Sequence, residues 1–259
     1  MNVRGEGIEL RDTLLAVSRR LPFFHARWNE QYGWHAAAAL AGLSGSLFVL
    51  TWLAERLVDD GTSFRWEARF NHWLDNEAWG PLVYFFRVVT VPGNTVFLVA
   101  AALAAGILLW ARGDRVDAAL VGLAFGGSAV VTFALKVLFE RPRPAFQDES
   151  LSLNTFSFPS GHASVSAAVY GAFAIIVLRD VRTWRGRALV LATLAVLLAL
   201  IGFSRIYLGA HFFSDVLAGY SLGTAWLMIC VLGLTVHEHR AREGSSRTYV
   251  DSRSSRTSP

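Results

Sequence analysis

Long runs of apolar residues, separated by shorter polar segments, dominate this chain. Six runs reach or approach the roughly 20 residues that a helix needs to cross a bilayer: 34–54, 95–111, 117–139, 163–178, 188–203 and 212–236. The fourth and fifth are short, and we expect neighbouring residues to extend them to the membrane surface. No internal repeat is visible, which excludes a solenoid or a propeller. The pattern therefore predicts an all-α, polytopic membrane protein with a bundle of six transmembrane helices.

The segment between the first two runs, residues 55–94, interleaves aromatic and polar residues at helical spacing. Tryptophan and tyrosine in such segments commonly lie at the depth of the lipid head groups. We therefore predict interfacial helices in this first outer loop, with five aromatic side chains at head-group depth: Trp66, Trp73, Trp79, Tyr84 and Phe86. A second interpretation, compatible with the first, is that this surface admits a lipid substrate sideways from the membrane.

Composition supports a membrane protein. Apolar residues make up 53% of the chain and charged residues 17%, with a mean hydropathy of +0.39. A soluble domain carries about 25% charged residues, and a disordered chain lacks this apolar and aromatic content. The single cysteine, Cys230, excludes an intramolecular disulfide and a cysteine zinc cluster.

The distribution of arginine predicts the orientation, because short cytoplasmic loops collect Lys and Arg. Sixteen arginines lie in one set of segments, and seven lie elsewhere. We expect a multi-pass protein of the inner (plasma) membrane, with both termini in the cytoplasm and an uncleaved first span. The expected parts are a cytoplasmic segment (1–33), the membrane domain (34–236) and a disordered cytoplasmic tail (237–259). The arginine-rich set comprises 1–33, 112–116, 179–187 and 237–259.

Polar residues at the predicted span ends form three clusters. The first follows the third apolar run, where Lys136, the only lysine, precedes Arg143 by seven residues. Pro142 and Pro144 flank that arginine and end the helix. Lys136 alone could simply reach the membrane interface. Together with Arg143 it favours a functional site, because charged groups near the membrane are costly.

The second cluster is FPSGHAS, residues 158–164. Pro159 and Ser160 are typical of a helix start, and we predict that Ser160 caps the fourth span. A helix N-terminus offers unpaired N–H groups and a partial positive charge, which favour an anion. Gly161 would let the anion approach the backbone, and His162 stands beside it. Considered alone, the cluster is better explained by a capped turn with an incidental histidine.

The third cluster, residues 204–215, places Arg205 at the end of the fifth span and His211 and Asp215 at the start of the sixth. Their i, i+4 spacing predicts one shared helix face, where the carboxylate would orient the imidazole. A pair that only caps a helix is the alternative. Counting the spans places all three clusters on the outer side. Three cations, two histidines and a helix N-terminus predict an oxyanion site, for which phosphate is the natural occupant.

Together the clusters resemble the signature of the type 2 phosphatidic acid phosphatase family, which reads KxxxxxxRP, PSGH and SRxxxxxHxxxD in this order. The resemblance extends over roughly residues 90–235 and includes the stretch TVPGN at 90–94. The first 90 residues match only in having one span and an outer loop. No signature position departs: the matches are Lys136, Arg143, Pro144, Pro159 to His162, Ser204, Arg205, His211 and Asp215.

The resemblance implies a six-helix enzyme that removes phosphate from lipid phosphates without a metal or other cofactor. His211 would be the nucleophile that forms a phosphohistidine, Asp215 would orient it, and His162 would act as general acid and then base. The implied partners are a lipid phosphate and membrane lipids, with no nucleic acid, and the site would face outside or the periplasm. The implied phosphate-binding residues are Lys136, Arg143, Ser160, Gly161 and Arg205.

Several functions remain open at this point. The substrate could be a polyprenyl diphosphate such as undecaprenyl diphosphate, phosphatidylglycerophosphate or phosphatidic acid. A phosphotransferase would pass the phosphoryl group to an acceptor other than water. A non-enzymatic anion-binding protein or transporter is disfavoured, because transporters place polar residues near the bilayer midplane on broken helices.

Overall fold

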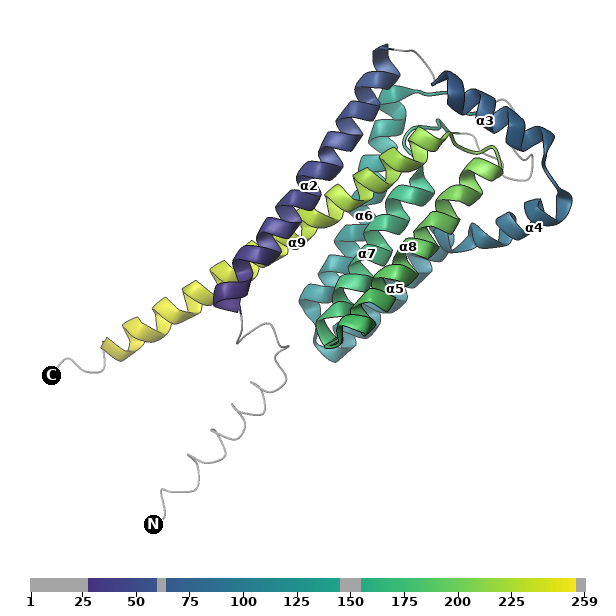
Figure 1. Cartoon of the computed structure of the whole chain (residues 1–259). Coiled ribbons are helices and arrows are strands. Elements are labelled where there is room, and N and C mark those ends of the chain that lie inside the picture. Colours follow the sequence, from purple (N-terminus) through teal and green to yellow (C-terminus); the bar gives the residue numbers. More distant parts are fainter. Residues whose placement is uncertain (1–27, 60–63, 145–154, 255–259) are drawn as a thin grey trace. The chain divides into compact units, whose positions relative to one another are not determined.

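The structure is a computed structural model that describes residues 28–59, 64–144 and 155–254. Within these ranges all regular elements are helices (Figure 1). In chain order they are α2 (Trp28–Asp59), α3 (Arg65–Asn76), α4 (Gly80–Val89), the 3-10 helix η2 (Val91–Gly93), α5 (Thr95–Arg112), α6 (Arg115–Phe139), α7 (Gly161–Asp180), α8 (Trp184–Tyr207) and α9 (Phe213–Ser254).

In the described part of the chain, six helical stretches are long and apolar enough to cross a membrane, which confirms the predicted fold class. The two short apolar runs are extended as expected, because α7 and α8 are 20 and 24 residues long. The second stretch is longer than predicted, since α4 and α5 together form an apolar segment of 33 residues. The stretches are Ala37–Val58, Gly80–Arg112, Arg115–Phe139, Gly161–Asp180, Trp184–Tyr207 and Phe213–His237.

The chain divides into two compact units, Met1–Ala38 and Ala39–Pro259. In the first unit, the described part is the beginning of α2; most of the expected cytoplasmic segment, residues 1–27, lies outside the described residues. In the second unit, α9 continues as a helix to Ser254, where we expected a disordered tail from residue 237. The stretch HEHRARE that follows the apolar run is rich in good helix formers, which favours this continuation. Residues 255–259 lie outside the described residues.

The second unit is centred on α7, whose first half consists almost entirely of small buried residues. Two glycines of α9 allow this helix to pack very closely against α7. A Cβ atom at Gly219 would lie 2.6 Å from the backbone oxygen of Ser160, and one at Gly223 would lie 2.1 Å from that of Ser164. Small residues that let two backbones approach are the usual means of helix packing in membranes.

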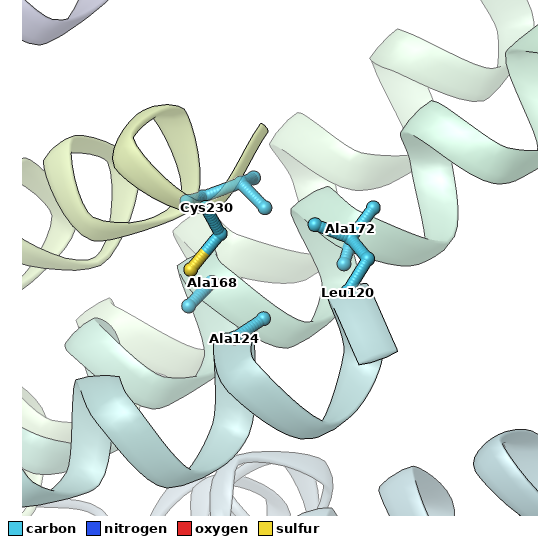
Figure 2. Close-up of a cluster of buried hydrophobic side chains, with 6 residues drawn as sticks. Leu120, Ala124, Ala168, Ala172 and Cys230 are labelled. Carbon is cyan, nitrogen blue, oxygen red and sulfur yellow. The ribbon is translucent and has the colours of Figure 1, made fainter. Parts of the chain in front are cut away.

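An apolar cluster joins α7 and α9 to α6. Figure 2 shows Leu120 and Ala124 of α6, Ala168 and Ala172 of α7 and Cys230 of α9 in this cluster. Cys230 is a buried free thiol. The cluster holds together three helices, and the candidate site described below lies at one end of these helices.

Helices α6 and α7 pack antiparallel. Near the end of α6, Thr132 Oγ1 donates a hydrogen bond of 2.8 Å to Ser164 Oγ, near the start of α7. At the opposite end, Asp117 in the first turn of α6 pairs with Arg179 in the last turn of α7. The last turn of α6 therefore lies beside the first turn of α7, which brings the first two polar clusters together.

The segment between the first two apolar runs forms two helices, α3 and α4, as the aromatic pattern predicts. Four of its five singled-out aromatic side chains, Trp66, Trp73, Trp79 and Tyr84, are exposed. Phe86 differs from the expectation, because it is buried against α8, with its ring centroid 4.6 Å from that of Tyr207.

Candidate active site

The site begins where α6 ends. Helix α6 stops at Phe139, and Glu140 adopts a left-handed conformation with φ of 45°, two residues before the first flanking proline, Pro142, requires a new direction. Lys136, in the last turn, donates a hydrogen bond of 2.6 Å to the carbonyl of Phe156. Lys136 thereby fixes the segment that precedes α7.

Arg143 reaches the same segment and also the nucleophile predicted for the site. Its Nε donates to the carbonyl of Thr155 at 2.7 Å, and its Nη1 donates to the carbonyl of Ala210 at 2.6 Å. The same Nη1 lies 3.5 Å from Nε2 of His211. Burial lowers the pKa of Arg143 from its ordinary value, and the charge of Asp215 opposes this shift. One edge of the guanidinium thus lies beside the ring nitrogen that would attack phosphorus.

His211 lies in the turn between α8 and α9, which corrects the sequence prediction. Helix α9 begins at Phe213, so His211 precedes it and does not share a helix face with Asp215. The turn is closed by backbone hydrogen bonds of 2.9 and 3.1 Å from the N–H groups of Ala210 and His211 to the carbonyl of Arg205, with Gly209 at a positive φ of 64°. The irregular turn, and not a helix, sets the direction of the imidazole.

Asp215 nevertheless faces His211, through a different geometry. Its Oδ2 accepts a hydrogen bond of 2.9 Å from the backbone N–H of Phe212 and lies 3.4 Å from Nδ1 of His211. Its Oδ1 pairs with Arg141. Both the carboxylate and the imidazole are buried. The prediction that Asp215 accompanies His211 therefore agrees with the geometry, while the reason given for it was wrong.

The N-terminus of α7 carries the second predicted cluster. Ser160 occupies the N-cap position, but its side chain makes no capping hydrogen bond. Its buried Oγ has no hydrogen-bond partner among the described residues, while its backbone N–H donates to the carbonyl of Asp215 at 2.9 Å. The predicted cap is therefore wrong. The hydroxyl, the first N–H groups of α7 at Gly161, and the helix dipole together make a suitable anion site.

His162 follows on the same turn and lies beside the 3-10 helix η2. A Cβ atom at Gly93 would come within 3.0 Å of Cδ2 of His162 and 2.6 Å of Ile201. Only glycine therefore lets this turn approach the imidazole so closely. Lys136, Arg143 and Arg205 carry the positive charges that act on the His162 ring.

Arg205 completes the cationic set from the last turn of α8. Its side chain is 1% exposed, and its Nη1 donates a hydrogen bond of 3.2 Å to Oγ1 of Thr90. Burial, followed by the positive charges of Lys136, Arg143 and Arg205, holds the pKa of His211 well below 6.5. The imidazole is therefore neutral at pH 7, which is the form that acts as a nucleophile.

The structure thus brings the predicted side chains of all three clusters into one region. It also shows three site residues that the sequence did not single out. Arg141, Glu67 and Asn71 are buried polar residues that contact Asp215, Ser214 or the backbone of His211. In the described part of the chain, no group of three or more His, Cys, Asp or Glu side chains is placed to hold a metal ion.

Comparison with known proteins identifies similar sequences and structures. Residues 117–237 match the family model of the PAP2 superfamily. Phosphatidylglycerophosphatase B of Bacillus subtilis (strain 168) is 34% identical over 136 residues, which are 52% of this chain and 66% of that protein. An uncharacterized 22.5 kDa protein in the cps region of Klebsiella pneumoniae is 31% identical over 134 residues, 51% of this chain and 60% of that protein.

Two solved structures are similar. The crystal structure of a transmembrane PAP2 type phosphatidylglycerolphosphate phosphatase from Bacillus subtilis has a TM-score of 0.62 and 26% identity, covering 74% of this chain and 93% of that one. The crystal structure of Aquifex aeolicus LpxE has a TM-score of 0.52 and 24% identity over 66% of this chain and 98% of that one, a likeness of fold alone.

The fold is therefore that of the transmembrane PAP2 phosphatases. The match of residues 117–237 to the PAP2 superfamily is the one that the three motifs predicted. The chain spans 66% and 60% of the lengths of the two curated relatives.

Proposed function

We propose that the protein is an integral-membrane lipid phosphatase that hydrolyses a lipid phosphate through a phosphohistidine at His211. The observation that carries the proposal is the position of the His211 ring. Its Nε2 lies 3.5 Å from Nη1 of Arg143, while its Nδ1 lies 3.4 Å from the Asp215 carboxylate. A phosphoryl group beside Arg143 would therefore meet Nε2 of an imidazole whose Nδ1 faces Asp215.

In the first step, the lone pair of His211 Nε2 attacks phosphorus, and the bond from phosphorus to the lipid oxygen breaks. His162 gives its proton to the departing oxygen, so the lipid leaves as an alcohol. Asp215 stabilises the positive charge that the phosphorylated imidazole acquires. In the second step, His162 takes a proton from water, the resulting hydroxide attacks phosphorus, and the phosphorus–nitrogen bond breaks. Phosphate is released, His211 is neutral again and His162 again carries its proton.

The protein's own cations balance the charge of the phosphoryl oxygens in this proposal. Lys136, Arg143 and Arg205 surround His211 closely enough to lower its pKa together. Ser160 Oγ and the first N–H groups of α7 add neutral donors on another side. We propose that this set makes a metal ion unnecessary for turnover.

We propose phosphatidylglycerophosphate as the first substrate to test, because the Bacillus subtilis relative and the solved structure are named for this activity. Phosphatidic acid and a polyprenyl diphosphate such as undecaprenyl diphosphate remain the next candidates.

The deciding experiment measures phosphate release from these three lipids by the detergent-solubilised protein, with and without EDTA. Rapid-quench reactions with radiolabelled substrate accompany it. We expect turnover in EDTA, inhibition by vanadate, and an acid-labile, base-stable label on the protein that His211→Ala lacks. Label on His211→Ala, or no label on the wild type with any substrate, would refute the nucleophile. Activity lost in EDTA and restored by Mg²⁺ would refute the metal-free mechanism.

A product assay with an added alcohol acceptor separates hydrolysis from phosphotransfer.

We further propose that the site faces the outer side of the membrane and that both chain termini are cytoplasmic. The sixteen-to-seven division of arginines supports this orientation. Single cysteines at positions 148 and 183, in a chain with Cys230 replaced, test it with an impermeant thiol reagent on intact cells. We expect labelling at 148 and protection at 183. The reverse pattern would overturn the orientation.

A further inference from the structure

We propose that Glu67 is a positioning residue of the phosphatase site, which holds Arg141 so that Asp215 keeps one carboxylate oxygen directed at His211. The inference rests on the function proposed above. Glu67 belongs to α3, in the outer loop, and lies 148 positions from Asp215 in the sequence. It is outside the three signature motifs and outside the region matched by the family model.

Glu67 is completely buried in α3, a helix in which several other side chains are exposed. Its exposed fraction is 0%, whereas the neighbouring Trp66 is 50% exposed and Trp73 is 55% exposed. Burying a carboxylate is costly unless it is paired and hydrogen-bonded. Both requirements are met. Oε1 accepts a hydrogen bond of 2.6 Å from the backbone N–H of Ser214, and Oε2 accepts one of 2.9 Å from its hydroxyl.

The second partner of Glu67 is Arg141. Nη2 of Arg141 lies 3.2 Å from Oε2 of Glu67, while Nη1 pairs with Oδ1 of Asp215. Nη1 also donates to the hydroxyl of Ser214 at 2.8 Å. One guanidinium is thus shared between two buried carboxylates, one on α3 and one on α9. The planar, fork-like arrangement of its donors fixes the angle between them.

The shared guanidinium determines which carboxylate oxygen of Asp215 faces His211. Oδ1 is engaged by Arg141, so Oδ2 is the oxygen that faces Nδ1 of His211. Without the charge of Glu67, the whole guanidinium charge would act on Asp215, and a bidentate arrangement that uses both carboxylate oxygens would become favourable. Oδ2 would then turn from the imidazole, and the phosphohistidine would lose part of its charge stabilisation.

Asn71 supports the same placement of α3. It lies four residues after Glu67 and therefore on the same helix face, is 1% exposed, and directs its Nδ2 to the carbonyl of His211 at 3.4 Å. Helix α3 thus contacts both the Arg141–Asp215 pair and the backbone of the nucleophile. The outer loop is then part of the catalytic geometry as well as a membrane-surface element.

The test compares Glu67→Gln with Asp75→Asn. The control removes the same charge from the same helix, but Asp75 is exposed in the last turn of α3. For Glu67→Gln we expect kcat to fall about 10–100-fold, the usual range when the group behind a reacting residue is changed, with KM within about twofold of wild type because no phosphate contact is lost. Asp75→Asn should keep both constants. Glu67→Asp, which retains the charge, should recover part of kcat.

A double-mutant cycle separates positioning from stability. If Glu67 acts through Asp215, adding Glu67→Gln to Asp215→Asn should cost little further activity. Fully additive losses, a wild-type kcat in Glu67→Gln, or a loss expressed in KM alone would overturn the proposal. If Glu67→Gln does not fold, Glu67→Asp alone decides: the proposal requires a lowered kcat at unchanged KM. Wild-type turnover in the same assay shows that the proposed function stands, so the two failures are distinguishable.

Discussion

Two arginine–carboxylate pairs lie at opposite ends of the antiparallel helices α6 and α7. At one end, Arg179 pairs with Asp117, and their side chains are 32% and 14% exposed. At the other end, Arg141 pairs with Asp215 and Glu67, and their side chains are 1%, 0% and 0% exposed. Both pairs join an arginine to a carboxylate, and they differ in how far the side chains are exposed to solvent.

This difference indicates what each pair is for. A pair in contact with water contributes about 0–1 kcal/mol to stability. A fully buried pair is not stabilised by its charges in proportion, because desolvation offsets the attraction, whereas removal of one partner costs about 3–5 kcal/mol. Apolar residues could fill the same volume without the cost of a buried charge that loses its partner. The buried pair is therefore best explained by its contact with His211, and the exposed pair by the joining of two helix ends.

Among the substitutions that test this comparison, Asp215→Asn should have the largest effect on activity. The substitution keeps the shape of the side chain, removes the charge behind His211, and leaves Arg141 with only one of its two carboxylates. A carboxylate-to-amide change behind a catalytic histidine costs up to about 10⁴-fold in rate. We expect kcat to fall by about 10³–10⁴-fold in a phosphate-release assay. A decrease of less than tenfold would show that the imidazole does not depend on this carboxylate.

His162→Ala should have the next largest effect, and that effect should depend on the substrate. Loss of a general acid typically costs about 10²–10⁴-fold, and a lipid alkoxide leaves less readily than the phosphate expelled from a diphosphate. We therefore expect the full loss with phosphatidylglycerophosphate and a smaller one with a diphosphate or an activated aryl phosphate. An equal loss with all three substrates would argue against proton donation by His162.

The sequence predicted the membrane fold well because apolar length is a local property. Each span needs only a run of residues long enough to cross the bilayer, so all six could be located, although the second stretch begins earlier and α9 ends later than predicted. Less local features were missed. Phe86 was assigned to the head-group region because its neighbours are aromatic and exposed, but it packs on Tyr207, about 120 residues later.

The residues of the site also divide into those that a local sequence pattern identifies and those that only the packing shows. Lys136, Arg143, His162 and Arg205 could be singled out because order and spacing along the chain carry the pattern, although their roles remain predictions. Arg141 was missed because it stands two residues before Arg143, and the signature contains one of the two. Glu67 could not have been found from the pattern. Its partners are Arg141, in the segment after α6, and Ser214 of α9, and only their contacts with Glu67 show why an acidic residue is buried in α3.

The pH dependence of the reaction tests the charges around His211, and the expected effect is smaller than those above. Because burial and three cations hold the pKa of His211 well below 6.5, its imidazole stays neutral as the pH falls below 6.5. The acid limb of kcat/KM should therefore lie below pH 6.5 in the wild type. Arg143→Met removes one of these cations, raises the pKa of His211 and should move the limb to higher pH. The substrate phosphate, with a second pKa of about 6, titrates identically with both enzymes. An unshifted limb would contradict this assignment of charges.

Asp117→Asn should have the smallest effect and is the counterpart of Asp215→Asn at the other end of α6. The Arg179–Asp117 pair is partly exposed and remote from the site, so we expect a loss of about 0–1 kcal/mol in unfolding free energy. The values of kcat and KM should be those of the wild type, and the acid limb should not move. Thermal unfolding in detergent and the phosphate-release assay, run beside Asp215→Asn, measure both quantities. If Asp117→Asn lowered kcat as strongly as Asp215→Asn, the ends of α6 and α7 would be coupled, and burial alone would not explain why one pair matters for catalysis. With the expected result, the cost of losing a carboxylate follows its distance from His211 and its exclusion from water.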